Sequence, residues 1–294
     1  METQHTTLTP QQQQNIVDYY ETAGPDYAVW SKQFNMHYGL ALRLTDLFHR
    51  ERMLENMNQS VLDRLKLDAS AENKIADLGC GMGAVTRYAA SRYPNSDFYG
   101  VSLVPYQIKT ANKLTDSALK NTQFLCEDFT KLPFQNDAID AAFALESACH
   151  GKGSEKRDFI KELSRVLKPG GRFVIADGFM KNPLKPLKGL AKRSYQQICK
   201  CWALPEFAQI EYFKACLEEH GLVNIKIEDV SWRVAPSVLH SPFLVLGFYL
   251  KSLLKREPLK EWQKNNLKGV LSAIVLGLKR SKFGYYIISG EKAG

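Results

Sequence analysis

Short apolar runs alternate with amphipathic stretches between residues 74 and 177, and this is the clearest pattern in the chain. Each run is typical of a buried strand, and each stretch between runs has apolar residues at helical spacing. The predicted strands are Lys74–Leu78, Asp97–Ser102, Thr122–Cys126, Ala138–Ala144 and Arg172–Asp177. The predicted helices are Ala84–Arg92, Tyr106–Lys120 and Glu155–Leu167, the last ended by Lys168-Pro169-Gly170-Gly171. Alternating strands and helices predict an α/β fold with a doubly wound, parallel sheet.

Less regular patterns flank this central part. Residues 1–14 are polar and rich in glutamine, and they predict a disordered tail. Further helices are predicted over Asn15–Tyr27, Leu40–Met57, Val61–Leu67, Leu190–Trp202 and Glu206–Gly221, and further strands over Val223–Val230 and Gly284–Glu291. Apolar stretches alternate with basic stretches in Ser237–Lys282. The complete sheet is therefore expected to contain seven strands.

Composition limits the classes of protein that fit. The chain has 294 residues and a net charge of +8, with the basic excess mainly in Lys181–Arg193 and Lys251–Lys282. That charge indicates an anionic partner, which could be a nucleic acid, a membrane surface or a substrate. Six irregularly spaced cysteines indicate a reduced, cytoplasmic protein, and Cys199-x-Cys201 lacks the second pair that a structural metal site needs. The sequence shows no signal peptide and no apolar run long enough to span a membrane.

The first predicted strand runs directly into a glycine-rich turn, Gly79-Cys80-Gly81-Met82-Gly83, with Asp77 two residues ahead of it. Glycines at alternate positions let the backbone bend sharply and bring its N–H groups close to a ligand. The spacing G-x-G-x-G differs from the dinucleotide fingerprint G-x-G-x-x-G. The turn therefore predicts a different ligand, and an ordinary glycine-rich loop is the alternative interpretation.

This turn resembles motif I of the class I S-adenosylmethionine (SAM) methyltransferases. The resemblance implies that the turn packs under the methionine part of SAM, and that Asp77 helps to hold the amino group of SAM. The cofactor contacts implied in the turn are Gly79, Cys80, Gly81 and Gly83. The segment Lys168–Gly171 also matches a structural motif of this family, ahead of the fifth predicted strand.

The adenosine part of SAM has implied contacts in three other segments. Asp128 would accept from the adenine amino group with Phe129 beside the ring, although Asp128 also suits a helix N-cap. Tyr20 is a further expected contact. Most family members end the second strand with an acidic residue that binds the ribose hydroxyls. Here that residue is absent, so Ser102 or Gln107 would have to serve the ribose.

The segment Gly100–Gln107 resembles a subgroup of this family that includes tocopherol methyltransferases, sterol C-methyltransferases and cyclopropane fatty-acid synthases. Several separated motifs resemble the tocopherol-type enzymes of this subgroup. They are Tyr19-Tyr20, Trp30, Met36-His37-Tyr38-Gly39 and Glu146-Ser147-Ala148-Cys149-His150. The implied fold is Rossmann-like, with a mostly parallel seven-stranded sheet, N-terminal helices and a helical substrate cover. The implied parts are a helical lid at 15–70 and a SAM-binding domain at 71–294, with cover insertions at about 179–205 and 233–282.

The resemblance implies the transfer of a methyl group from SAM, with S-adenosylhomocysteine as product. Methylation of an alkene or aromatic carbon creates a cation that must lose a proton. Glu146, His150 and His37 are the candidate proton acceptors, and a surface Glu–His pair is the alternative for the first two. Aromatic rings stabilise a cation by about 0.5–2 kcal/mol each. The candidate substrate contacts are Tyr19, Trp30, Tyr38 and Trp202, although packing also explains such residues.

The predicted function is C-methylation of a small, amphipathic, isoprenoid-like acceptor. N- or O-methylation of a small metabolite or alkaloid is the second candidate. A less favoured third class is a non-catalytic SAM-binding module or a nucleic-acid methyltransferase. The absence of an Asn/Asp-Pro-Pro-Tyr motif after the fourth strand argues against amino methylation of nucleic-acid bases. No metal is expected. Ser237–Leu254 and the lysines after it predict peripheral contact with an anionic membrane, and a cavity cover or homodimer interface is the alternative.

Overall fold

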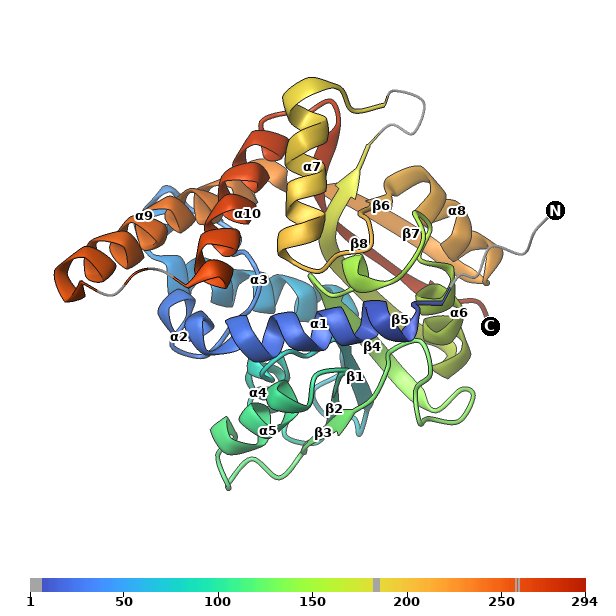
Figure 1. Ribbon diagram of the computed structural model, residues 1–294. Coiled ribbons are helices and arrows are strands. Elements are labelled where there is room, and N and C mark those ends of the chain that lie inside the picture. Colours follow the sequence, from blue (N-terminus) through green and yellow to red (C-terminus); the bar gives the residue numbers. More distant parts are fainter. Residues whose placement is uncertain (1–6, 182–185, 257, 259) are drawn as a thin grey trace.

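A single mixed sheet forms the centre of the molecule (Figure 1). The computed structural model describes residues 7–181, 186–256, 258 and 260–294. The strands are β1 (Lys74–Leu78), β2 (Asp97–Ser102), β3 (Thr122–Cys126), β4 (Ile139–Leu145), β5 (Leu167–Met180), β6 (Ala208–Gln209), β7 (Leu222–Asp229) and β8 (Phe283–Lys292). Their order is β3-β2-β1-β4-β5-β8-β7, and the short β6 pairs with β5. Only β8 is antiparallel to its neighbours β5 and β7 among the described strands. The predicted Rossmann-like sheet is confirmed, with β6 as an eighth strand.

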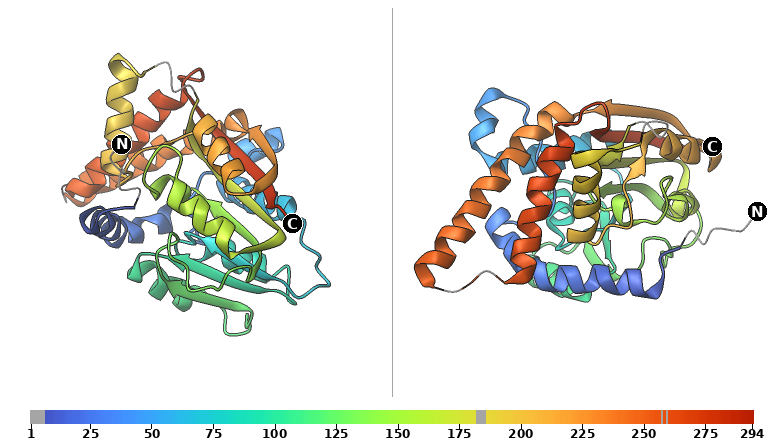
Figure 2. Two further views of the ribbon diagram at one scale, coloured as in Figure 1. Left: turned by 90° about the vertical axis from the view of Figure 1, so that its right-hand side faces the viewer. Right: turned by 45° about the horizontal axis from the view of Figure 1, so that its top comes forward.

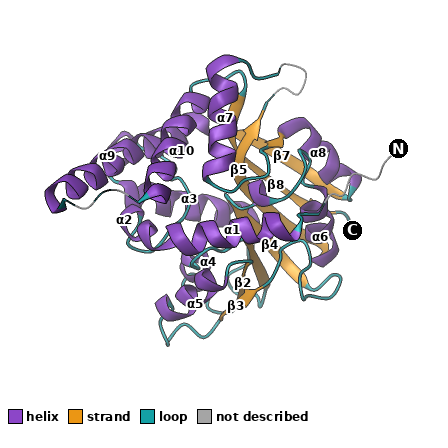
Figure 3. Cartoon of the chain, viewed as in Figure 1, coloured by secondary structure: helices purple, strands orange, loops and turns teal. Residues whose placement is uncertain are grey.

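Helices cover both faces of this sheet and the end at which its parallel strands terminate (Figure 3). The helices are α1 (Pro10–Ala23), α2 (Tyr27–Trp30), α3 (Arg50–Leu65), α4 (Ala84–Ala90), α5 (Pro105–Leu114), α6 (Arg157–Val166), α7 (Gly189–Cys201), α8 (Ile210–Glu219), α9 (Ser231–Lys255) and α10 (Glu261–Gly277). Three short 3-10 helices are η1 (Gly24–Asp26), η2 (Leu44–Phe48) and η3 (Ala148–His150). Since β1 pairs with both β2 and β4, the strand order reverses there, and open α/β sheets bind their ligands at such a point.

Alternating residues of the strands build two apolar cores, one on each face. Ala142 and Ile175 belong to the core with α6 and α8, whereas Phe143 and Val174 belong to the core with α3 and α4. Neighbouring residues of a strand point to opposite faces, so a sheet covered on both faces needs nearly continuous apolar strands. These two cores hold the strand ends that carry the site.

The N-terminal third differs from its prediction in two places. Thr9 and Gln12 form a capping box that starts α1 at Pro10, so the predicted disorder is wrong from that residue onward. Residues 1–6 lie outside the described residues. The predicted helix Leu40–Met57 is also wrong, because the Asp46 carboxylate accepts the backbone N–H groups of Leu42 and Arg43 and turns the chain into η2. A single helix, α3, then replaces the second half of that prediction and the separate helix at Val61–Leu67.

The irregular stretch Ser237–Lys282 forms most of the long helices α9 and α10, and α9 extends away from the rest of the molecule (Figure 2). The predicted cover at 179–205 contains α7, and the cover at 233–282 contains nearly all of α9 and α10; residues 182–185, 257 and 259 lie outside the described residues. Helices α7 and α10 pack against each other above the sheet (Figure 1). Among the described residues, no helix is long and apolar enough to cross a membrane.

Candidate active site

The glycine-rich turn after β1 adopts a backbone that a larger residue would not fit. Gly79 has a φ of +92°, and a Cβ atom added to it would overlap the Ser147 Cβ atom. The N–H groups of Gly79 and Cys80 both donate to the carbonyl of Val101, at 2.9 and 2.8 Å. These bonds fix the turn across the carboxyl ends of β1 and β2. Glycine is therefore required at 79 by both conformation and space.

A narrow cavity lies above this turn. Of the predicted cofactor residues, it is lined by Tyr20, Asp77, Gly79, Cys80, Gly81, Ser102, Gln107, Asp128 and Phe129. Gly83 is not among its lining residues and instead lies against the Phe124 ring, where a Cβ would come within 2.5 Å of that ring. Met36 covers the turn, since a Cβ on Gly81 would lie 2.9 Å from the Met36 Sδ. The structure thus brings together nine of the ten predicted cofactor residues.

Asp77 is almost completely buried at the base of this cavity. The Thr86 hydroxyl donates to its Oδ2 at 2.6 Å, and no other hydrogen bond to its carboxylate is found among the described residues. Burial raises the pKa of Asp77 to about 7, and the bond from Thr86 opposes that rise. A ligand ammonium group would compensate the buried charge, so this side chain fits the amino group of SAM.

The other predicted contacts leave specific groups for the adenosine part. The Ser102 hydroxyl donates to Gln107 Oε1 at 2.6 Å, which leaves the Gln107 amide N–H₂ to donate to a ribose oxygen. The Gln107 Nε2 atom lies 3.7 Å from Met36 Sδ, which is only a weak acceptor. Asp128 Oδ1 accepts from Thr130, and Oδ2 accepts from Gln13 of α1 at 2.7 Å. The α1 helix is thus tied to the carboxylate predicted to bind adenine.

A second and much larger cavity, of about 490 Å³, adjoins the narrow cavity above the glycine-rich turn. Its walls come from α1, α2, α7, α9, α10 and β8, and all four predicted substrate contacts, Tyr19, Trp30, Tyr38 and Trp202, line it. Apolar side chains of α9 and α10 such as Val245 and Leu267 contribute most of the remaining wall. Cavities of this size that are mainly apolar with a few polar groups are typical of small-molecule sites.

Five residues line both cavities, and these mark the passage between them: Tyr20, Met36, His37, Glu146 and His150. Glu146 follows β4 with a φ of +51°, a region that residues other than glycine rarely adopt. Its Oε1 accepts from the Tyr38 backbone N–H at 2.7 Å and from the Tyr285 hydroxyl at 2.8 Å. No described residue hydrogen-bonds to Oε2, which leaves that oxygen for a ligand. Burial raises the pKa of Glu146 to about 8.

His150 lies on η3 with its Nε2 atom 2.9 Å from the Tyr20 hydroxyl. Burial, assisted by the charge of Lys156, lowers the pKa of His150 to about 4, so the imidazole is neutral at physiological pH. Lys156 is completely buried and donates to the carbonyls of Cys149, Gly151 and Glu206. It therefore joins the turn that carries His150 to the segment between α7 and β6.

His37 is a poorer proton acceptor than Glu146 or His150. Its two ring nitrogens already lie 2.9 Å from the Tyr38 carbonyl and 3.2 Å from Asn35 Oδ1. Burial lowers the pKa of His37 to about 4. The neutral ring donates through only one of these nitrogens, and both nitrogens face oxygen atoms of the 35–38 segment. This side chain is therefore better placed to hold that segment over the passage than to receive a proton.

Three further residues line the large cavity and were missed as site residues: Tyr27, Asp177 and Tyr285. Tyr27 belongs to a helical apolar repeat and Tyr285 to an apolar strand, so both resemble packing residues in the sequence. Asp177 ends the strand predicted as the fifth, and its position at a carboxyl end was the available signal. Its carboxylate accepts the N–H groups of Cys149 and Gly178 and so fixes the start of η3.

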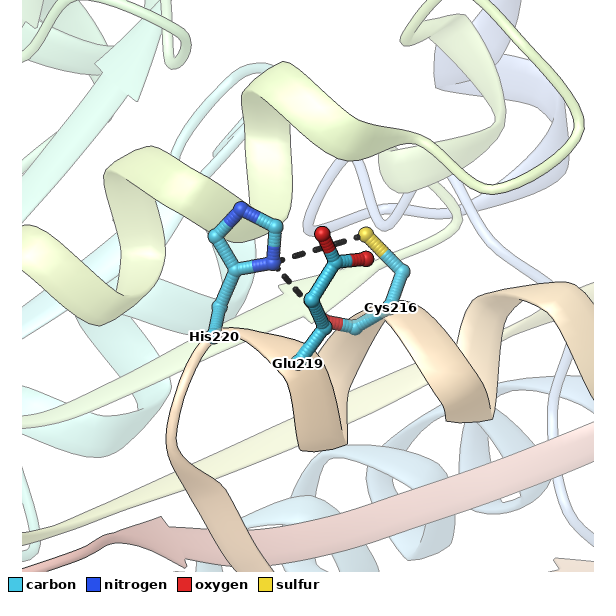
Figure 4. Close-up of side chains that lie close together, drawn as sticks. All are labelled: Cys216, Glu219 and His220. Atoms are coloured by element: carbon cyan, nitrogen blue, oxygen red, sulfur yellow. Dashed lines mark hydrogen bonds between the residues drawn. The ribbon is translucent and has the colours of Figure 1, made fainter.

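Within the part of the chain that the structure describes, one group of side chains has metal-ligand chemistry: Cys216, Glu219 and His220 at the end of α8 (Figure 4). Both Glu219 carboxylate oxygens pair with Arg157, at 2.7 and 2.9 Å, and His220 Nδ1 lies 2.8 Å from the Cys216 carbonyl. These contacts explain the group as the end of a helix joined to α6. It lies outside both cavities.

Comparison with known proteins agrees with this site. A family model described as a methyltransferase domain matches residues 76–175. The chloroplastic tocopherol O-methyltransferase of Arabidopsis thaliana is 30% identical over 305 residues, which cover 97% of this chain and 84% of that protein. The 2-methyl-6-phytyl-1,4-hydroquinone methyltransferase of Synechocystis sp. is 34% identical over 161 residues, 54% of this chain and 49% of that protein.

A solved structure shows the same fold along almost the whole chain. The geranyl diphosphate C-methyltransferase from Streptomyces coelicolor A3(2), in complex with geranyl diphosphate and S-adenosylhomocysteine, superposes with a TM-score of 0.73. It is 17% identical, and the match covers 98% of this chain and 100% of that chain. The fold and the site together define a class I methyltransferase.

The chain belongs to the SAM-dependent methyltransferases and, within them, resembles the tocopherol and sterol methyltransferase group. The predicted enzyme class and cofactor are therefore confirmed. The residues present fit SAM, because the turn at Gly79 has no room for a side chain and Asp77 is a buried carboxylate suited to an ammonium group.

Proposed function

We propose that this enzyme methylates a carbon atom of a small amphipathic acceptor with an isoprenoid-like part. The observation that carries the proposal is the large, mostly apolar cavity that meets the cofactor cavity at Glu146 and His150. Names of relatives support the acceptor class, since they include tocopherol, phytyl hydroquinone and sterol methyltransferases. An apolar wall of this extent suits a hydrocarbon chain.

The chain's own residues position the acceptor and remove its proton. SAM supplies an electrophilic methyl group when bound. An acceptor carbon that has gained this methyl group leaves a cation, which must lose a proton from the same carbon in an aromatic ring or from an adjacent carbon in an alkene. Glu146 Oε2 is the proposed receiver of that proton, directly or through the neutral His150 beside it. Tyr20, Tyr38 and Trp30 lie around the passage and present ring surfaces to the developing positive charge.

O-methylation is the second candidate, because the Arabidopsis relative is named an O-methyltransferase. Glu146 and His150 could equally take the proton from a hydroxyl group. N-methylation needs no different residue in the site, so the acceptor decides among the three. These alternatives differ in the product and not in the protein.

Identification of the product tests the proposal. The purified enzyme is incubated with methyl-labelled SAM and 2-methyl-6-phytyl-1,4-hydroquinone, γ-tocopherol or a Δ24 sterol as trial acceptors. With a ¹³C label in the methyl group, we expect one of them to gain about 15 mass units, because one labelled methyl group replaces one hydrogen, and the NMR spectrum of the product should show that methyl group bound to carbon. Label on oxygen or nitrogen would favour the second candidate. No labelled product from these compounds or from a lipid extract would contradict the acceptor class.

We further infer that the enzyme is cytoplasmic and that it contacts a membrane peripherally through the segment 237–254, which forms much of α9. A homodimer that buries the same face is the competing use of that segment. Six exposed or half-exposed apolar residues of α9 make a free, fully hydrated face unfavourable: Leu239, Phe243, Leu246, Tyr249, Leu250 and Leu254.

A further inference from the structure

Two segments far apart in the sequence form one apolar and basic surface beside the large cavity. We infer that η2 and the α9–α10 hairpin together dock on an anionic lipid bilayer, and that this docking places the mouth of the acceptor cavity at the membrane. The inference deepens the proposed function and rests on its lipid-like acceptor. This docking surface consists of residues 40–48, 231–256 and 260–282.

The charge of the protein is concentrated in this hairpin. Residues 231–282 contain ten lysines and arginines against two glutamates, a net charge of +8 that equals that of the whole chain. The remaining residues are therefore neutral in sum. Arg256, Lys260, Lys264 and Lys268 are exposed near the end of α9 and along α10. Each basic residue near an anionic membrane contributes about 1 kcal/mol of attraction.

The 40–48 segment adds apolar residues that the sequence placed inside a helix. Leu44 and Phe48 of η2 are 83% and 82% exposed, more than most apolar residues of the chain. This segment is attached to α9, because His240 Nε2 lies 2.8 Å from the Leu47 carbonyl and the Ala41 N–H donates to the Arg233 carbonyl at 2.8 Å. Apolar side chains on η2 and α9 are therefore carried by one connected unit.

The wall of the large cavity continues onto this surface. Trp232, Leu239 and Tyr249 of α9, together with Leu278 after α10, line the cavity and are also 43–76% exposed. The acceptor can thus pass from the outside to Glu146 along apolar side chains. A hydrocarbon chain that leaves a bilayer by this route avoids most of its exposure to water, which costs about 0.8 kcal/mol for each CH₂ group.

Charge favours a bilayer over a second copy of the chain. In a two-fold symmetric dimer the same patch contacts itself, so the exposed basic residues of two copies, among them Arg256, Lys260, Lys264 and Lys268, would be brought together. An anionic lipid surface would instead be attracted. An apolar face bordered by Lys and Arg is typical of helices that lie in the interface of a membrane, and no described helix is suited to cross one.

Co-sedimentation of the full chain with vesicles tests the docking surface. The vesicles contain phosphatidylcholine with about one third phosphatidylglycerol, and phosphatidylcholine alone is the comparison. We expect the wild type to pellet with the anionic vesicles at low salt and to be released by 0.5 M NaCl, because salt screens exposed charges within about 10 Å at 0.1 M. The double substitution Leu44→Asp with Phe48→Asp should weaken this binding at least about tenfold.

The matched control is Leu114→Asp with Tyr212→Asp, which changes two residues that are 39% and 44% exposed on α5 and α8. The control should bind the vesicles as the wild type does, and SAM affinity by calorimetry should be the same in all three proteins. A wild type that stays in the supernatant, or an η2 variant that pellets fully, would overturn the inference. So would a dimer in sedimentation velocity that the η2 variant disrupts while vesicle binding is unchanged.

Turnover separates this inference from the proposed function. The probe is 2-methyl-6-phytyl-1,4-hydroquinone, supplied either in the anionic vesicles or in micelles of a neutral detergent. Relative to the wild type, we expect the turnover of the η2 variant to be at least about tenfold lower with vesicles and less than about twofold lower with micelles. Equal losses in both would overturn entry from the membrane. If even the wild type methylates neither form, the acceptor is wrong, and co-sedimentation still decides the docking surface.

Discussion

The two cavities that meet at Glu146 are built in different ways. The cofactor cavity is narrow and consists of strand ends and of turns whose backbone leaves no room for an extra carbon atom. The acceptor cavity has a volume of about 490 Å³ and consists of helix faces with flexible apolar side chains. The first recognises a ligand by backbone shape and a buried carboxylate, and the second by volume and apolar surface.

This difference predicts how each side responds to change. A tightly fitted backbone loses its ligand after a small substitution, because its neighbours cannot move. Substitutions in the apolar helix walls should change which acceptor the enzyme prefers more readily than they reduce its turnover. Only the passage between the cavities, with Tyr20, Glu146 and His150, belongs to both, and substitutions there should be the most damaging to turnover.

The largest effect is expected for Glu146→Gln. The substitution keeps the shape of the side chain and removes the group that receives the proton, so turnover should fall about 10²–10⁴-fold. SAM affinity by calorimetry should change by less than about threefold, since the contacts of the cofactor cavity remain. Glu155→Gln, at a partly exposed position outside both cavities, is the matched control. If Glu146→Gln keeps the wild-type turnover, Glu146 does not receive the proton and has a purely structural role.

The next effect is on the cofactor side, where two glycines provide a matched pair. Gly79 and Gly153 have φ values of +92° and +81°, but a Cβ on Gly79 would overlap Ser147 whereas one on Gly153 would meet nothing within 4 Å. Gly79→Ala should weaken SAM binding by about tenfold to a hundredfold, equivalent to about 1.4–2.8 kcal/mol. Gly153→Ala has the same backbone strain and should bind SAM normally in calorimetry. Equal losses in both would mean that strain, and not space at the turn, is responsible.

The cofactor side could be predicted closely from the sequence. The bounds of β1, β2 and β3 agree with the structure, and nine of ten predicted contacts line one cavity. The reason is that these residues lie within or directly after short strands, and carboxyl ends of neighbouring parallel strands meet at one edge. Gly83 shows the limit of such a motif, because spacing alone does not separate a ligand contact from packing against Phe124.

The acceptor side could be predicted only in outline. Its walls come from residues 19–38, 198–249 and 263–285 and from the ends of β4 and β5, and no local pattern records how such segments meet. Tyr285 has the pattern of a core residue, and only the register of β8 beside β5 brings its hydroxyl to Glu146. The helix predicted at Leu40–Met57 failed for a different, local reason, since hydrogen bonds from the backbone N–H groups of Leu42 and Arg43 to the Asp46 carboxylate outweighed the apolar repeat.

A smaller effect is expected for Lys156→Met, which tests how the two sides are held together. Removal of the ammonium group leaves the carbonyls of Cys149, Gly151 and Glu206 without this donor, at a cost of about 1–3 kcal/mol for an unsatisfied buried group. The midpoint of thermal unfolding should fall by several degrees. Turnover should fall about tenfold through displacement of His150, with SAM affinity unchanged. Lys152→Met is the control, and an unaltered turnover in Lys156→Met would separate this lysine from the placement of His150.

The smallest expected effect is a shift of a pH profile in Tyr285→Phe. The Tyr285 hydroxyl donates to Glu146 Oε1 at 2.8 Å and stabilises the carboxylate, opposing the burial that raises the pKa of Glu146 to about 8. The carboxylate is the form that accepts a proton, so kcat/KM in the free enzyme should rise with pH through that pKa. Loss of the hydroxyl should raise this pKa further and move the rise in kcat/KM to higher pH by about one unit, which corresponds to about 1.4 kcal/mol. Tyr286→Phe changes the next residue of β8, which lies outside both cavities, and should leave the midpoint in place. A midpoint that stays fixed in Tyr285→Phe, or moves to lower pH, would mean that ionisation of Glu146 does not limit turnover, and the proton would then have to leave through His150 alone.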